Sequence, residues 1–211
     1  YYRLTDEWGM GWQMPADGGH YYDLYHSPLA RVETVQDVER FPWPDPLDAA
    51  RFVGMHEAAD QVVYGEEKAF ILERMSSGMW EHAMWMRGYE QFFVDMVTNQ
   101  TLVHAIMSKI LEVKMGYWGR ALEVIGDYPV VVSEADDYGT QISQLVSPRL
   151  FREVMKPRLQ VVNERIHQLA PQAKLFFHTC GSVREILPDL LEIGVDILNP
   201  VHVRATGMEP A

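Results

Sequence analysis

After about residue 68 the hydrophobic pattern alternates between short apolar runs and longer stretches with helical spacing. Continuous apolar runs bounded by turn residues predict buried strands. The four predicted strands are residues 69–75, 129–133, 174–178 and 195–199. Helical spacing predicts helices over residues 80–97, 100–125, 147–169 and 183–193, with Ser147 as an N-cap and a kink at Pro157. Apolar strands separated by helices are typical of a parallel sheet covered by helices.

Polar side chains gather where each predicted strand ends. They are Ser76 and Ser77, then Glu134, Asp136 and Asp137, then His178 and Cys180, and finally Asn199 and His202. A ring of such groups at one end is typical of (β/α)₈ barrel enzymes, whereas no GxGxxG loop follows the first strand. A barrel needs eight strands and ~250 residues. We therefore expect an α/β chain of the (β/α)₈ TIM-barrel type, represented by roughly its first half and truncated at the C-terminus.

The first 45 residues are rich in aromatic residues, glycine and proline and show no sustained helical period. Short strands are predicted near residues 8–12 and 21–25, followed by the stiff connector FPWPDP and a helix over residues 47–64. We expect residues 1–68 to form an irregular, aromatic N-terminal segment with a helix, packed on a partial barrel of residues 69–211.

Composition narrows the possible partners and compartment. The 211-residue chain has a formal charge of −12, which disfavours a general nucleic-acid surface. No apolar run approaches the ~20 residues that a membrane helix needs. The single cysteine cannot form an intramolecular disulfide and fits a reducing cytosol. We expect a cytoplasmic protein that has neither nucleic-acid nor membrane partners.

His178 and Cys180 carry the most informative chemistry. Side chains two apart on a strand point the same way, and imidazole with thiolate is a favoured zinc pair. Ser182 and Glu185 match a capping box, which predicts a helix whose positive end favours the Cys180 thiolate. The alternative is that Cys180 is a small buried hydrophobic residue. His202 is a possible third ligand, although a solvated histidine at the rim fits its position better.

Asp136 and Asp137 are candidate catalytic carboxylates, with Asp137 preferred. Neighbouring carboxylates repel, so one can keep a proton and serve as a general acid; either could instead orient a metal-bound histidine or hold a cationic group. The alternative is an acidic loop in which an aspartate caps a turn. The candidate substrate-binding residues are Ser77, Gln141, Asn199 and Arg204, of which Arg204 could pair with an anion.

Several motifs together resemble the uroporphyrinogen decarboxylase superfamily. The motifs are HTCGSVR at 178–184, LPDL at 187–190, GVDILNP at 194–200, DDYGTQ at 136–141 and PWPDP at 42–46. The resemblance implies a (β/α)₈ barrel. His178 and Cys180 match the first part of the His-x-Cys zinc motif of its methyltransferase branch, which includes methylcobalamin:coenzyme M methyltransferases.

That branch implies a zinc-activated thiol that attacks a methyl group on a corrinoid such as methylcobalamin. The implied partners are a corrinoid protein and a small thiol, and a third ligand, a cysteine, is expected beyond residue 211. Two alternatives stay open. One is the metal-free decarboxylase branch, which grips a carboxylated tetrapyrrole with arginines near its N-terminus. The other is a non-catalytic corrinoid-binding partner.

Overall fold

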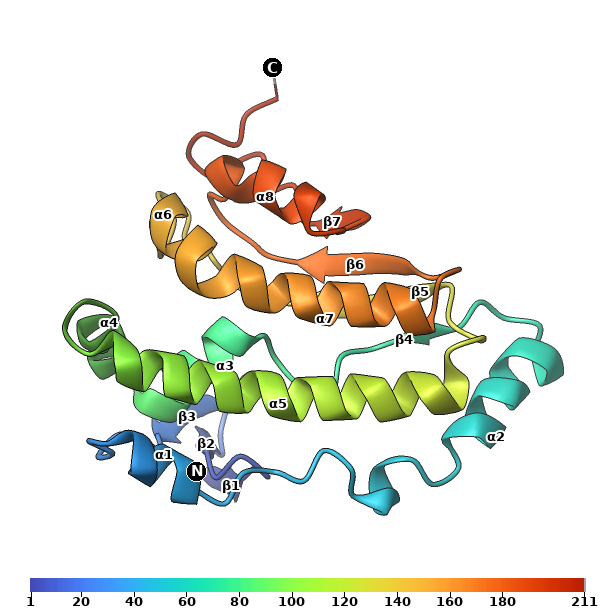
Figure 1. Cartoon of the computed structure of the whole chain (residues 1–211), viewed down its shortest axis with the longest axis horizontal. Coiled ribbons are helices and arrows are strands. Elements are labelled where there is room, and N and C mark those ends of the chain that lie inside the picture. Colours follow the sequence, from blue (N-terminus) through green and yellow to red (C-terminus); the bar gives the residue numbers. More distant parts are fainter. Residues whose placement is uncertain (211) are drawn as a thin grey trace. The chain divides into compact units, whose positions relative to one another are not determined.

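The predicted parallel sheet is present in the computed structural model, which describes residues 1–210 (Figure 1). Its strands are β4 (Ile71–Leu72), β5 (Val131–Ala135), β6 (Lys174–His178) and β7 (Ile197–Asn199). They lie in the order β4-β5-β6-β7, each parallel to its neighbour. Within the described residues the sheet is open, with β4 and β7 at its edges. This parallel arrangement is consistent with part of a (β/α)₈ barrel, and β4 is shorter than predicted.

The chain divides into two compact units. Unit 1 is Tyr1–Asp45 with Glu81–Val113, and unit 2 is Pro46–Trp80 with Lys114–Ala211. The parallel sheet belongs to unit 2. The boundary expected near residue 68 stays a prediction. Among residues 1–210, no helix combines the length and the apolar character that crossing a membrane requires.

Unit 1 is built on an antiparallel sheet of three short strands, two of them near the predicted positions. The sheet comprises β1 (Tyr2–Thr5), β2 (Gly11–Met14) and β3 (Asp23–His26), in that order. Its helices are α1 (Val35–Arg40), most of α3 (Met79–Arg87), α4 (Tyr89–Thr98) and the first half of α5 (Gln100–Ile125). Arg87 is buried, and its guanidinium bonds Asp95 at 2.7 Å and the Leu29 carbonyl at 2.7 Å. These bonds offset the cost of burying the charges.

One face of the parallel sheet is covered by helices of unit 2. Glu134 of β5 lies on this face beside buried Phe177 of β6. Its carboxylate accepts bonds from Lys114 at 2.9 and 3.0 Å and from the Trp118 indole at 2.6 Å, both on α5. A buried ion pair needs such added hydrogen bonds to offset desolvation. The helix α7 (Lys156–Leu169) packs along β6 (Figure 1).

The predicted helix over 47–64 is broken. Gly54 has φ of +73°, a left-handed conformation that favours glycine and ends the helical path. The segment forms η1 (Ala49–Arg51), α2 (Met55–Asp60) and the π-helix η2 (Gln61–Gly65).

The start of the helix over 147–169 is confirmed. Ser147 caps α6 (Pro148–Leu150) by accepting from the Leu150 N–H at 3.3 Å. A π-helical turn, η3 (Phe151–Met155), separates α6 from α7, so Pro157 falls in the first turn of α7. The N–H groups of the first turn have no partner within the helix, so the missing N–H of Pro157 costs no interior hydrogen bond.

The predicted capping box after Cys180 is wrong. The Ser182 hydroxyl donates to the Thr206 carbonyl at 2.7 Å, and the first helical turn has no side-chain cap. The helix begins as a 3₁₀ turn, η4 (Arg184–Ile186), and continues as the six-residue α8 (Leu187–Glu192). A helix this short and this far along the chain gives the Cys180 thiolate little of the stabilisation expected from a helix end.

Asp189 ties α8 to the preceding helices. Its buried carboxylate accepts bonds from Arg152 of η3 at 3.0 Å and from Lys156 of α7 at 2.8 Å. The Arg152 hydrogen bond is the main cause of a pKa below the usual 3.8, and Lys156 adds to it although burial opposes the shift. Because the pKa is lowered in the folded state, ionised Asp189 stabilises the fold.

We predict that Asp189→Asn lowers the free energy of unfolding at pH 7 and flattens its acid dependence. The Asp189 contribution is complete above about pH 5, falls as the pH drops below the unfolded value of ~3.9, and vanishes below the folded-state pKa. Urea unfolding measured from pH 7 to pH 3 should show the wild type and the variant converging in acid. Asp17→Asn, an exposed loop change, is the control. A constant gap between Asp189→Asn and wild type across this range would contradict the prediction.

Candidate functional site

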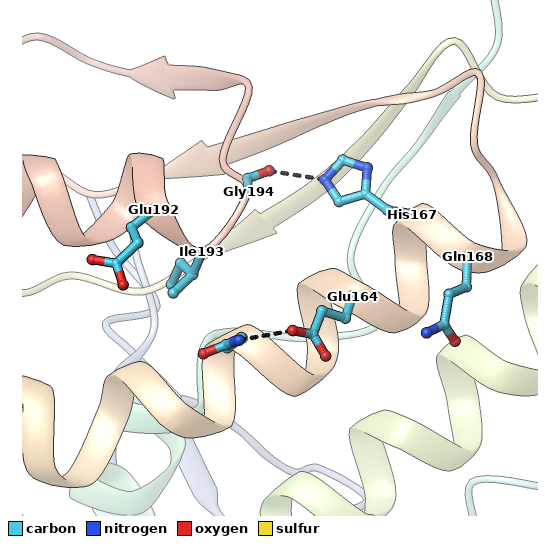
Figure 2. A pocket seen from close by; sticks show the side chains of 7 residues that line it. Glu164, His167, Gln168, Glu192, Ile193 and Gly194 are labelled. Atoms are coloured by element: carbon cyan, nitrogen blue, oxygen red, sulfur yellow. Dashed lines mark hydrogen bonds between the residues drawn. The ribbon is translucent and has the colours of Figure 1, made fainter.

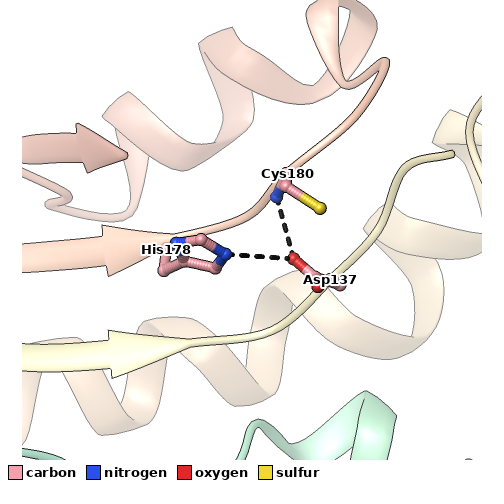
Figure 3. A group of neighbouring side chains, drawn as sticks. All are labelled: Asp137, His178 and Cys180. Carbon is pink, nitrogen blue, oxygen red and sulfur yellow. Dashed lines mark hydrogen bonds and ion pairs between the residues drawn. The ribbon is translucent and has the colours of Figure 1, made fainter. Parts of the chain in front are cut away.

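Three potential metal ligands meet where β5 and β6 end (Figure 3). Asp137 follows β5, His178 is the last residue of β6, and Cys180 comes two residues later. One ligand atom from each lies within 4.8 Å of the other two. The parallel pairing of Ala135 with His178 brings the two strand ends together. The structure thus places Asp137, one of the two aspartates considered for orienting a metal-bound histidine, beside the His178–Cys180 pair.

The Asp137 carboxylate is held by the backbone beside the thiol. The Cys180 N–H donates to Asp137 Oδ1 at 2.8 Å, and His178 Nε2 lies 3.6 Å from the same oxygen. About a third of the His178 and Asp137 side chains is exposed, and Cys180 is half-buried. The cluster is therefore both positioned by the protein and accessible to a ligand.

Asn199 sets the tautomer of His178. The pairing of β6 with β7 places the two residues side by side, and His178 Nδ1 lies 2.8 Å from Asn199 Oδ1. An amide oxygen only accepts hydrogen bonds, so Nδ1 carries the hydrogen and the lone pair of the neutral ring is on Nε2. Nε2 is the nitrogen beside Asp137. Metal-binding histidines characteristically donate their other N–H to such an acceptor.

The side chain of Asp136 points into the core, whereas that of Asp137 points toward His178 and Cys180. Its side chain is completely buried, and Oδ2 accepts from the Trp80 N–H at 2.7 Å and from the Tyr138 hydroxyl at 2.8 Å. Its own N–H donates to the His178 carbonyl at 2.9 Å. The sequence barely separates the two aspartates, because only the course of the loop decides which carboxylate faces inward. A catalytic role for either residue stays a prediction.

Tyr138 and Thr179 fix the loop that carries Asp137, and the sequence analysis did not select them. The Tyr138 ring stacks on Phe177 at 6.5 Å and meets Phe151 edge-on at 5.0 Å. Its N–H donates to the Thr179 hydroxyl at 3.2 Å, and both residues are fully buried. One feature of the sequence could have indicated Tyr138: it is an aromatic residue in an otherwise polar loop, and such residues often anchor a loop to the core.

The remaining sequence candidates do not contribute to the three-residue cluster. Ser77 is half-buried, while Gln141 and Arg204 are exposed on loops. His202 Nδ1 accepts a 3.3 Å hydrogen bond from the Gly181 N–H and is outside the metal-ligand group found among residues 1–210. Substrate-binding roles for Ser77, Gln141, Asn199 and Arg204 remain predictions.

A pocket of about 360 Å³ lies elsewhere in unit 2, between α7 and the end of α8 (Figure 2). Within it His167 Nε2 is 2.8 Å from the Gly194 carbonyl, and the Gln160 amide donates to Glu164 at 2.7 Å. The first contact joins α7 to a residue just after α8, and the second lies within α7. Neither contact pairs a nucleophile with a base.

Comparisons with known proteins identify the family. Residues 8–201 match the sequence profile of the family described as uroporphyrinogen decarboxylase (URO-D). No curated protein matches the sequence. A solved methyltransferase from Methanosarcina mazei is similar in structure, with a TM-score of 0.67 and 20% identity. The similarity covers 91% of this chain and 52% of that one, so the chain spans about half its length. At this identity the likeness shows a shared fold, and it is the profile match that assigns the family. The chain belongs to the uroporphyrinogen decarboxylase family.

Proposed function

We propose that this chain provides the zinc site of a methyltransferase that moves a methyl group between a corrinoid and a thiol. The observation that carries the proposal is the convergence of Asp137, His178 and Cys180 at the carboxyl ends of two parallel strands. Imidazole, thiolate and carboxylate are the ligand types that zinc takes in proteins. The structural similarity to a methyltransferase supports the choice of reaction.

The residues fit the proposed ion. His178 would bind through Nε2, because its Nδ1–H is committed to Asn199. Cys180 would bind as the thiolate, and Asp137 would supply the third donor of the described chain. A catalytic zinc keeps one position for substrate. There the ion would supply one kind of chemistry: it would lower the pKa of the acceptor thiol, so that a thiolate would be present at neutral pH.

The surrounding residues would then position the reactants. The proton that the acceptor thiol loses would pass to solvent, which reaches the part-exposed cluster. A docked corrinoid would supply the methyl group, and its cobalt would keep the electron pair of the cobalt–carbon bond when the sulfur–carbon bond forms. Arg204, Ser77 and Gln141 are proposed to hold the rest of the thiol substrate. Asp136 is proposed to act through position alone, by fixing the loop that presents Asp137.

The proposed partners are a corrinoid protein, which carries methylcobalamin or a related group, and a small thiol. Part-exposed Asp137, His178 and Cys180 lie at the strand ends, where a docked corrinoid would approach. The proposed compartment is the reducing cytosol, because the cluster needs Cys180 as a free thiol.

We predict about one zinc per chain, lost when either strand-end ligand is removed. Cys180→Ala and His178→Ala each delete a donor that no other group replaces in the cluster. Metal analysis after dialysis, with zinc titration by calorimetry, measures this directly. His20→Ala, a change at an exposed histidine in unit 1, should keep its zinc. Zinc retained at the wild-type level in Cys180→Ala would refute the site.

A second prediction concerns Asn199 as the residue that positions His178. Asn199→Leu should weaken zinc binding by about 10- to 100-fold, the usual cost of losing the acceptor behind a metal-bound histidine. Asn199→Asp should recover most of the affinity, because a carboxylate also accepts from Nδ1–H. Gln36→Leu makes the same amide-to-apolar change at an exposed site on α1. Equal affinities for Asn199→Leu and Gln36→Leu would remove Asn199 from the zinc site.

The activity test uses the protein that carries this chain, expressed with its natural ends. With methylcobalamin and a small thiol, we expect zinc-dependent loss of the cobalt–carbon absorbance, which a chelator abolishes and added zinc restores. Cys180→Ala should reduce the rate to the uncatalysed background. Release of carbon dioxide from a carboxylated tetrapyrrole by metal-free protein would instead establish the decarboxylase reaction. Tight corrinoid binding with neither turnover would indicate a non-catalytic partner.

A further inference from the structure

A pocket of about 370 Å³ lies in unit 2 away from the proposed zinc site. Its walls include His56, Tyr64, Glu123, Asp127 and Tyr128. Tyr128 lies three residues before β5 begins, whereas Asp137 comes after β5 ends. The pocket is therefore at the amino ends of the strands, opposite the metal-ligand cluster. Nothing in the proposed reaction uses these residues.

The helix α2 and the π turn after it supply two lining residues, His56 and Tyr64, and also Asp60, which bonds the lining residue Tyr128. His56, Asp60 and Tyr64 are spaced four apart, which places successive members on one helix face. In η2 the Glu66 N–H bonds the Gln61 carbonyl at 2.8 Å, five residues back. A π turn contains more residues than an α-helical turn, so the chain rotates less per residue about the helix axis. This smaller rotation keeps Tyr64 on the face of His56 and Asp60. Single π turns of this kind are frequent at functional sites.

The aromatic rings form walls at steep angles to one another. The rings of His56 and Tyr128 are 5.4 Å apart with an interplanar angle of 84°. Tyr64 and Tyr128 are 6.1 Å apart at 69°. The face of an aromatic ring attracts a cation, and several rings set at such angles can surround a cation on more than one side.

A hydrogen-bond chain fixes the central ring. The Tyr128 hydroxyl donates to Asp60 at 2.8 Å, so it accepts from His56 Nε2–H at 3.1 Å. The pKa of Tyr128 is raised to about 12, mainly by the hydrogen bond to Asp60. Tyr128 therefore remains un-ionised at neutral pH, and its orientation is set before any ligand arrives.

The charge around the pocket is negative. Glu123 and Asp127 line it, Asp60 is bonded to its central ring, and no lysine or arginine is among its lining residues. The Glu123 carboxylate lies 3.6 Å from Arg120 and 3.8 Å from Arg165, which offsets part of its charge. Asp127 is exposed and forms no ion pair within the described residues. A cation entering the pocket would thus meet ring faces and at least one available carboxylate.

We propose that this pocket binds a small alkylated ammonium ion. A metal ion is disfavoured, because among residues 1–210 the metal-ligand atoms converge at Asp137, His178 and Cys180 and not here. Aromatic walls suit alkyl groups that carry a positive charge and no hydrogen-bond donors. The volume lies within the range of small-molecule sites. The proposal does not depend on the zinc site, and the ligand would act as an effector and not as the transferred group.

The test compares choline with 3,3-dimethylbutan-1-ol, which has the same shape without the charge. Calorimetry or ligand-observed NMR on the whole chain should detect choline binding and little binding of the neutral alcohol. Tyr64→Leu should weaken choline binding by about fivefold and Tyr64→Phe should change it by less than about twofold, because the ring face is the attractive element. Tyr64 is 73% exposed, so neither change should unfold the protein.

Controls separate the pocket from general surface binding. Tyr21→Leu alters a tyrosine of unit 1 that is 83% exposed and should leave choline binding unchanged. Asp127→Asn should weaken choline binding, whereas Asp17→Asn should not. Equal binding of choline and the neutral alcohol, no binding of either, or equal losses in Tyr64→Leu and Tyr21→Leu would each overturn the proposal. Zinc content should be the same in all these variants, so the test is independent of the proposed function.

Discussion

The buried carboxylate of Asp136 is the constraint on which the candidate site depends. A buried polar group is costly unless hydrogen bonds replace the lost hydration. Here the replacements include the Trp80 N–H and the Tyr138 hydroxyl, which come from segments following two different strands. A Cβ added at Gly78 would overlap Asp136 Cγ, so the chain passes Asp136 with no room for a side chain. Asp136 thus locks the loop after β5 against the segment after β4.

This lock determines where Asp137 can be. The next residue along the chain must turn away from the core, toward the end of β6. There the backbones of Gly139 and Gly181 approach so closely that a Cβ on either would crowd the other loop. The Ser182 N–H completes the contact by donating to the Thr140 carbonyl at 2.8 Å. Two loops in direct backbone contact can hold Asp137 Oδ1 at hydrogen-bond distance from the Cys180 N–H.

The acidic residues of unit 2 have different structural roles, and the burial and partners of each carboxylate determine its role. Glu134 is buried with Lys114. Asp189 is buried and pairs with Lys156 and with the half-exposed Arg152, so both carboxylates join helices to the rest of the unit. Asp137 is left part-exposed beside a thiol and an imidazole. In the proposed cation pocket, Asp60 orients a tyrosine while Asp127 stays in solvent. The overall charge of −12 conveys none of these distinctions, because it counts carboxylates without their partners.

The sequence alone determined the parallel sheet, the order of its strands along the chain, and the pairing of His178 with Cys180. These depend on local patterns: apolar runs, a spacing of two on a strand, and the Ser147–Pro148 helix start. Only the tertiary structure decided that Asp137 and not Asp136 joins the cluster, that Asn199 orients His178, and that Ser182 bonds Thr206 in place of capping a helix. Each of these results brings together residues from separate segments of the chain. Local periodicity cannot specify such contacts, because they follow from how the strands and loops pack in three dimensions.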